Sequence, residues 1–148
     1  MSGFKITYAP PVVESLKTKT KRDITASESD STITSANVLE GAYYRTLESG
    51  QKGQDIFLIS DVNTFASECG LEIGDSISFK IYVDNAGTWG LVLPSPRDLA
   101  GISYFGDVPP LRNGILTTVA SIQVDLEFFY PRIGKLVVSI TNKSELKI

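Results

Sequence analysis

Residues Ile122–Tyr130 read IQVDLEFFY, and this stretch decides the fold class. Apolar side chains occupy every second position, so an extended chain here has one apolar face and one mostly polar face. The apolar positions are Ile122, Val124, Leu126, Phe128 and Tyr130. This period of two predicts a β-strand that turns one face toward a core.

Similar short runs recur from residue 32 onward, each bounded by glycine, proline, asparagine or aspartate. The expected strands are Ala42–Leu47, Asp55–Ile59, Ser76–Asp84, Trp89–Leu93, Ile102–Phe105, Ile115–Tyr130 with a break near Ala120, and Ile133–Thr141. Many short strands separated by turns are typical of an all-β sandwich or barrel. We therefore predict an all-β fold.

One stretch has the spacing of a helix instead of a strand. Its apolar residues lie three or four positions apart, with a capping residue before them and a glycine after them. The residues are Ser60 or Asp61 as cap, then Val62, Phe65, Ala66 and Cys69, and finally Gly70. We expect one short helix here, with Cys69 in the core, because no basic cluster is near it to lower its thiol pKa.

The first part of the chain differs from the rest in composition. Residues 1–31 are polar and rich in charge, which predicts an N-terminal arm that is flexible or ordered by a neighbour, ahead of a β-sandwich domain over residues 32–148. Within the arm, Phe4–Tyr8 alternates and could add to a sheet edge. The basic run Lys17–Arg22 could contact nucleic acid, although such a run is more often a solvated tail.

The amino-acid composition limits the classes of function that the chain can have. The 148 residues carry a net charge of −3, one cysteine and no histidine. Without histidine there is no Ser–His or Cys–His nucleophile pair, and the commonest zinc ligand is missing. No phosphate-binding glycine loop or nucleophile elbow occurs either. We expect no enzyme activity, no metal and no cofactor; a hydrolase using paired carboxylates such as Asp125 and Glu127 is the weakest alternative.

Other features of the sequence concern the cellular location and the partners of the chain. No apolar run approaches the roughly 18 residues of a membrane-spanning helix, and the start MSGFKITYAPPVV does not resemble a signal peptide. We therefore expect neither membrane insertion nor secretion. The net charge of −3 gives no reason to expect that the folded body binds nucleic acid independently of sequence.

Several apolar residues fall on strand faces that should be solvated. Tyr82, Phe129 and Val137 each lie among polar residues of the outward face, where a monomeric sandwich is normally polar. Either the arm or a loop covers them, or a second subunit does. The predicted subunit interface consists of these residues and the neighbouring Glu127.

Aromatic residues also suggest a second function class, a carbohydrate- or receptor-binding module. Trp89, Tyr43 and Tyr104 could stack on sugar rings if they were exposed. The alternative for each is packing in the core or in an interface.

Residues 32–141 resemble a β-rich domain of structural proteins from virophages, large DNA viruses and tailed phages. The similar segments are Thr32–Gly41, Asp61–Phe65, Gly74–Asn85, Asn113–Gly114, Val124–Tyr130 and Lys135–Ile140. The resemblance implies a jelly-roll-like β-sandwich, commonly a homotrimer, that lies in or on a capsid with other capsid proteins. It implies a location in the virion or in the cytoplasm of an infected cell.

Overall fold

The computed structural model describes residues 19–26, 29–47, 53–84, 89–109 and 121–144. Nine strands and two short helices lie in these ranges. In chain order they are β1 (Lys19–Ala26), β2 (Ser29–Ile33), α2 (Ser35–Glu40), β3 (Gly41–Leu47), β4 (Gly53–Phe57), α3 (Val62–Glu68), β5 (Ser76–Asp84), β6 (Trp89–Val92), β7 (Ile102–Gly106), β8 (Ser121–Arg132) and β9 (Lys135–Ser144).

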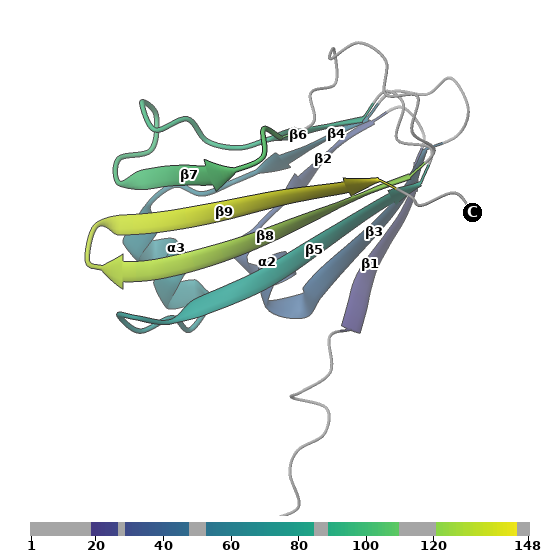
Figure 1. The fold of residues 1–148 in the computed structure, drawn as a ribbon. Coiled ribbons are helices and arrows are strands. Elements are labelled where there is room, and N and C mark those ends of the chain that lie inside the picture. Colours follow the sequence, from purple (N-terminus) through teal and green to yellow (C-terminus); the bar gives the residue numbers. More distant parts are fainter. Residues whose placement is uncertain (1–18, 27–28, 48–52, 85–88, 110–120, 145–148) are drawn as a thin grey trace, which may run out of the picture.

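The strands form two sheets, which confirms the prediction of a mostly β fold. The large sheet has the order β1-β3-β5-β8-β9-β7, and the small sheet has the order β2-β4-β6 (Figure 1). Among the described strands, β5 with β8 and β8 with β9 pair antiparallel, whereas the other pairs are parallel. A jelly roll pairs its strands antiparallel, so this topology differs from the one that the resemblance implies.

The parallel pairs follow from the path of the chain. It enters the large sheet as β1, β3 and β5, and each time the next strand, β2, β4 or β6, belongs to the small sheet. Helices α2 and α3 return the chain to the large sheet, so each new strand enters in the same direction as the one before. The β8–β9 hairpin then lies between β5 and β7 (Figure 1).

Helix α3 is the helix that the sequence predicts. Its Asp61 cap accepts a hydrogen bond from the Thr64 backbone N–H at 2.9 Å, and Val62, Phe65 and Ala66 are buried. The expectation of a single helix was wrong, because α2 is also present. Val38 is the buried residue of α2, so this short helix shows almost no apolar periodicity in the sequence.

The predicted boundary of the N-terminal arm also needs correction. Strand β1 pairs with β3, and β2 pairs with β4, so residues 19–26 and 29–33 are parts of the two sheets. The boundary at residue 31 therefore falls inside β2. The predicted edge strand Phe4–Tyr8 and the start of the basic run Lys17–Arg22 lie outside the described residues, as does Ile115–Ala120.

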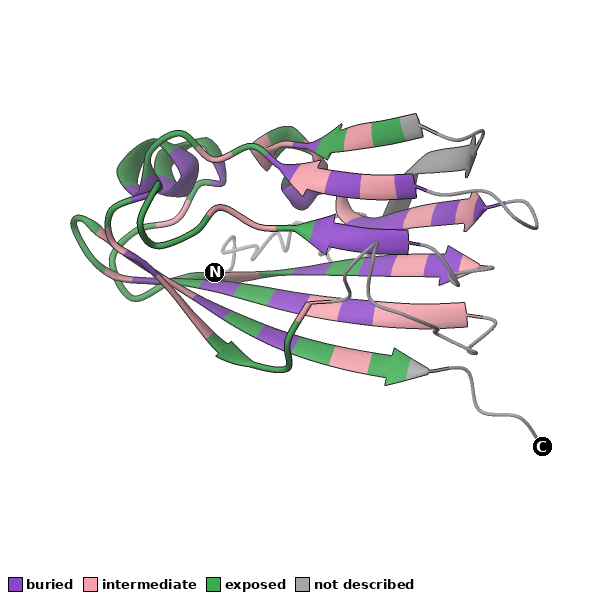
Figure 2. Cartoon of the chain, turned by 90° about the horizontal axis from the view of Figure 1, so that it is seen from above, coloured by how far each residue is buried: buried purple, intermediate pink, exposed green. Residues whose placement is uncertain are grey.

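The core lies between the two sheets and beneath the helices. Buried and more exposed residues alternate along the strands (Figure 2), as the period of two predicts. Phe57 of the small sheet meets Phe128 of the large sheet with 5.7 Å between ring centroids, and Phe65 of α3 lies 4.9 Å from the same ring. Cys69 is buried, as expected.

Candidate functional site on the outer face of the large sheet

The outer face of the large sheet is the face turned away from the small sheet. On β5, β8 and β9 the inward residues are buried, and the residues between them face outward. All four predicted interface residues, Tyr82, Glu127, Phe129 and Val137, lie on this outer face. Phe129 is 37% exposed, and Glu127 is also exposed.

These residues form two separate groups. Phe129 of β8 lies opposite Val137 of β9, and Phe105 of β7, which is 61% exposed, lies diagonally next to Val137. We call these three residues the hairpin-end patch. Tyr82 instead lies opposite Gln123, which is about 20 Å along β8 from Phe129. The structure therefore does not join Tyr82 to the hairpin-end patch, and Phe105 is not among the interface residues that the sequence predicts.

The end of the hairpin is fixed to helix α3 through Asn63. The Asn63 Oδ1 atom accepts a hydrogen bond from the Tyr130 hydroxyl at 2.9 Å and another from the Gly134 N–H at 2.7 Å. One side chain of α3 thus holds the strand and the turn that flank Phe129. The hairpin-end patch is consequently presented by a supported part of the fold.

Charged side chains lie between the two groups. Asp125 pairs with Lys143 at 3.3 Å and accepts a hydrogen bond from the Gln123 amide at 2.6 Å. Lys80 and Glu127 have no ion pair within the described part of the chain. Asp125 and Glu127 thus share a face, as predicted, but Asp125 is already occupied by two partners.

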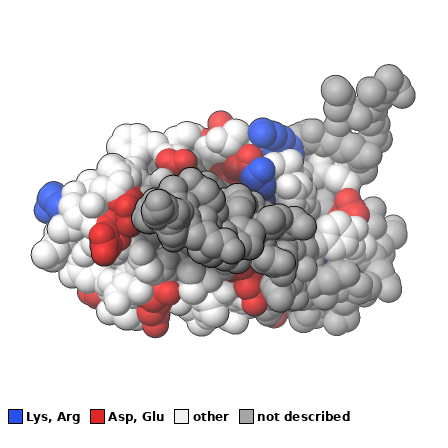
Figure 3. Space-filling model, turned by 90° about the horizontal axis from the view of Figure 1, so that it is seen from below, with Lys and Arg blue, Asp and Glu red and all other residues white. Residues whose placement is uncertain are grey.

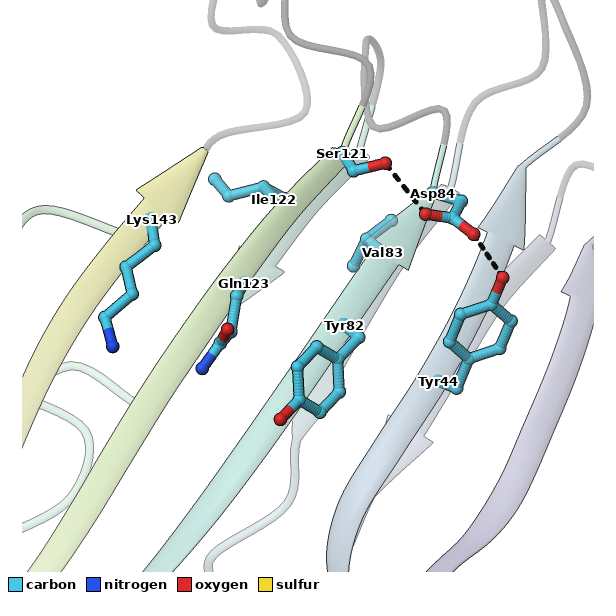
Figure 4. A pocket seen from close by; sticks show the side chains of 8 residues that line it. All are labelled: Tyr44, Tyr82, Val83, Asp84, Ser121, Ile122, Gln123 and Lys143. Carbon is cyan, nitrogen blue, oxygen red and sulfur yellow. Dashed lines mark hydrogen bonds between the residues drawn. The ribbon is translucent and has the colours of Figure 1, made fainter. Parts of the chain in front are cut away.

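The second group surrounds a hollow of about 470 Å³ near the ends of β3, β5 and β9. Tyr44, Tyr82, Gln123 and Lys143 are successive cross-strand neighbours on β3, β5, β8 and β9 (Figure 4). Beside this row, Asp84 accepts hydrogen bonds from the Tyr44 hydroxyl and, at 2.8 Å, from the Ser121 hydroxyl. We call this site the tyrosine hollow.

Two of the residues predicted to stack on sugar are in the core. Trp89 is 1% exposed and Tyr43 is fully buried, so neither ring can reach a ligand on the surface. Their polar atoms donate to the same carboxylate, Asp55, at 2.7 Å each. Burial, helped by the charge of Asp55, raises the pKa of Tyr43 to about 12.

Tyr104, the third residue predicted to stack, is partly buried beside an apolar groove of about 440 Å³ between the edges of β6 and β7. Its hydroxyl donates to the Pro94 carbonyl at 2.5 Å. Burial raises the pKa of the Tyr104 hydroxyl well above its ordinary value. Its polar end is therefore already used within the fold.

The carboxylate of Asp55 is the centre of a buried polar cluster between the sheets. Arg45 of β3 donates to it at 2.5 Å, and both side chains are completely buried. Burial raises the pKa of Asp55, while Arg45 and the hydrogen bonds from Tyr43 and Trp89 lower it. Closed off from solvent, this cluster joins the sheets instead of binding a ligand.

The sequence predicts Tyr43, and not Tyr44, as an exposed aromatic residue. The buried Arg45 explains this error. In β3 the inward positions include the charged residue Arg45, so polarity does not show which of two adjacent tyrosines faces out. Only the pairing of Tyr44 with Tyr82 places it on the outer face. No signal in the sequence reports that pairing.

On the side seen in Figure 3, acidic side chains are scattered over the described residues and do not form one cluster. No group of three or more Cys, Asp or Glu in the described ranges is placed to hold a metal ion. None of the helices in the described ranges is long and apolar enough to cross a membrane.

Comparison of the chain with models of protein families, with curated proteins and with solved structures found no match. Proposals about its function therefore rest on the geometry and sequence of this chain.

Proposed function

We propose that the chain is a structural assembly protein that forms a homo-oligomer through the outer face of the large sheet. The observation that carries this proposal is the hairpin-end patch, in which Phe129 and Phe105 are 37% and 61% exposed around Val137. Neighbouring exposed aromatic and aliphatic side chains mark interaction surfaces, and aromatic residues are enriched at the centres of interfaces.

The charges beside the patch favour a second copy of the chain as its partner. Lys80 and Glu127 lie on the same face, on neighbouring strands, and neither has an ion pair within the described residues. When two copies meet through this face, the Lys80 of each can pair with the Glu127 of the other. Such mutual pairing is what an isologous contact requires.

The number of subunits follows from the kind of contact. An isologous contact closes as a dimer, whereas a cyclic trimer joins two different patches of each subunit. The resemblance to virion proteins favours a trimer, and the self-complementary charges favour a dimer. A measured mass distinguishes the two.

The particle as the place of assembly is supported by the sequence resemblance alone. In this proposal the protein is a component of a virus particle and contacts other capsid proteins. Mass spectrometry of purified particles tests it: peptides of this chain in proportion to the major capsid protein support the proposal, and their absence contradicts it.

The substitution Phe129→Glu tests the assembly surface. A charge at the centre of the patch should shift the protein to monomers, because a buried unpaired carboxylate is costly. Sedimentation velocity measures the shift, and circular dichroism checks that the subunit stays folded.

The matched control is Ile133→Glu. Ile133 is 68% exposed and lies in the turn of the same hairpin, beyond the patch. The control should keep the mass of the unmodified protein. If Phe129→Glu also kept that mass, the hairpin-end patch would not be the contact.

A further inference from the structure

The tyrosine hollow has the composition of a small-ligand site. Its row of Tyr44, Tyr82, Gln123 and Lys143 crosses four neighbouring strands, which is about 14 Å at the usual spacing. Figure 4 shows the two rings on adjacent strands, with the amide and the ammonium group continuing the row. Ligand sites commonly combine an apolar or aromatic surface with a few placed polar groups.

Several polar atoms of the hollow are available to a ligand. The Tyr82 hydroxyl has no hydrogen-bond partner within the described residues, and the Gln123 amide donates to Asp125 while its oxygen is left as an acceptor. The Asp84 carboxylate is held in place by the Ser121 hydroxyl at 2.8 Å and by Tyr44. A carboxylate oxygen has more than one acceptor position, so a ligand hydroxyl can still donate to it.

The charge of the hollow indicates a neutral ligand. Lys143 is the cation that lines it, and Asp125 already pairs with Lys143 at 3.3 Å. The Asp84 carboxylate would repel an anion, although it already accepts hydrogen bonds from two hydroxyl groups. The site thus offers flat rings and hydrogen bonds without a net positive charge.

We propose that the tyrosine hollow binds a neutral oligosaccharide laid across strands β3 to β9. The apolar C–H faces of the sugar rings would lie on Tyr82 and Tyr44, and sugar hydroxyls would bond to Asp84, Gln123 and the Tyr82 hydroxyl. Aromatic side chains with a polar end suit ligands that have both an apolar surface and groups that form hydrogen bonds.

The hollow shares no residue with the assembly surface proposed above. Tyr82 lies about 20 Å from Phe129 along the strand direction, whereas Lys80, which would pair with the other copy, lies two residues from Tyr82 on the same strand face. Because no residue is shared, binding of a glycan and formation of an oligomer can be tested with separate variants of the same protein.

A printed array of neutral, sialylated and sulfated oligosaccharides, probed with the full chain, tests the proposal. Neutral glycans should bind, and titration calorimetry with the strongest of them should show binding about tenfold weaker for Tyr82→Ala. The control Ile133→Ala removes an exposed apolar side chain from the turn of the β8–β9 hairpin, outside both the hollow and the hairpin-end patch. It should bind within about twofold of the unmodified protein.

Several outcomes would overturn the proposal. The first is that the folded protein binds no neutral glycan, and the second is that Tyr82→Ala binds as tightly as Ile133→Ala does. Asp84→Asn separates a neutral sugar from a cation: the amide still accepts hydrogen bonds, so sugar binding should weaken only severalfold. A preference for acidic glycans, or for an amine that Asp84→Asn abolishes, would also contradict the assignment.

Discussion

Asp55 makes polar contacts that join the two sheets. It receives hydrogen bonds from Tyr43 and Arg45 of the large sheet and from Trp89 of the small sheet. We predict that Asp55→Asn lowers the free energy of unfolding by about 3–5 kcal/mol, because Arg45 would then be buried without its counter-charge. Urea unfolding followed by tryptophan fluorescence measures the loss.

The control for this prediction is Asp125→Asn. Asp125 also pairs with a cation, but the side chains of Lys143 and Asp125 are 57% and 26% exposed. An exposed pair contributes about 0–1 kcal/mol, so the control should unfold nearly as the unmodified protein does. Similar losses in both variants would mean that the buried pair is not a major source of stability.

Cys69 makes stability depend on pH on the alkaline side. Burial, with a smaller effect of Glu68, raises the pKa of its thiol from 9.0 to about 11. The folded chain thus keeps a proton that the unfolded chain loses, so the free energy of unfolding falls as pH rises between these values. Cys69→Ala should reduce this slope in urea titrations across the same range; an unchanged slope would contradict the assignment.

At the scale of elements, glycine decides how closely β7 approaches the β8–β9 turn. Gly101 has φ +88°, and a Cβ atom there would lie 2.0 Å from the Gly134 carbonyl oxygen. The Gly101 carbonyl also accepts a hydrogen bond from the Leu136 N–H at 2.9 Å. We predict that Gly101→Ala costs more than about 2 kcal/mol of unfolding free energy, through backbone strain and this clash.

Gly74→Ala is the matched control for Gly101→Ala. Gly74 has a similar φ of +95°, but a Cβ atom there meets nothing within 4 Å. It should therefore show the cost of the backbone conformation alone, about 1 kcal/mol. Equal thermal shifts for the two variants would show that the close approach does not constrain β7.

The elements that sequence predicts well are those with a strict pattern. Strands β5 and β8 alternate over their whole length, and α3 has both a cap and an apolar stripe. Helix α2 and strands β1 and β2 were missed, because short or polar segments carry little periodicity. Parallel pairing could not be predicted, because alternation records which side chains share a face and not the direction of the neighbouring strand.

At the scale of the whole molecule, the sequence predicts which side chains face outward from the large sheet, but not how they group on that face. Tyr82, Phe129 and Val137 were expected on an outward face because each interrupts a polar series. Their division into a hairpin-end patch and a tyrosine hollow depends on which residues of β5, β8 and β9 lie opposite one another. Phe105 and Tyr44 join these groups only through the pairing of β7 and β3 with their neighbours.

We propose that this chain assembles with copies of itself through the hairpin-end patch. The native mass of the full, unmodified chain, measured by mass spectrometry over a series of micromolar concentrations, tests it most directly. We predict a discrete multiple of the chain mass, with two copies for an isologous contact or three for a cyclic one. A chain that remains a strict monomer at every concentration would contradict it.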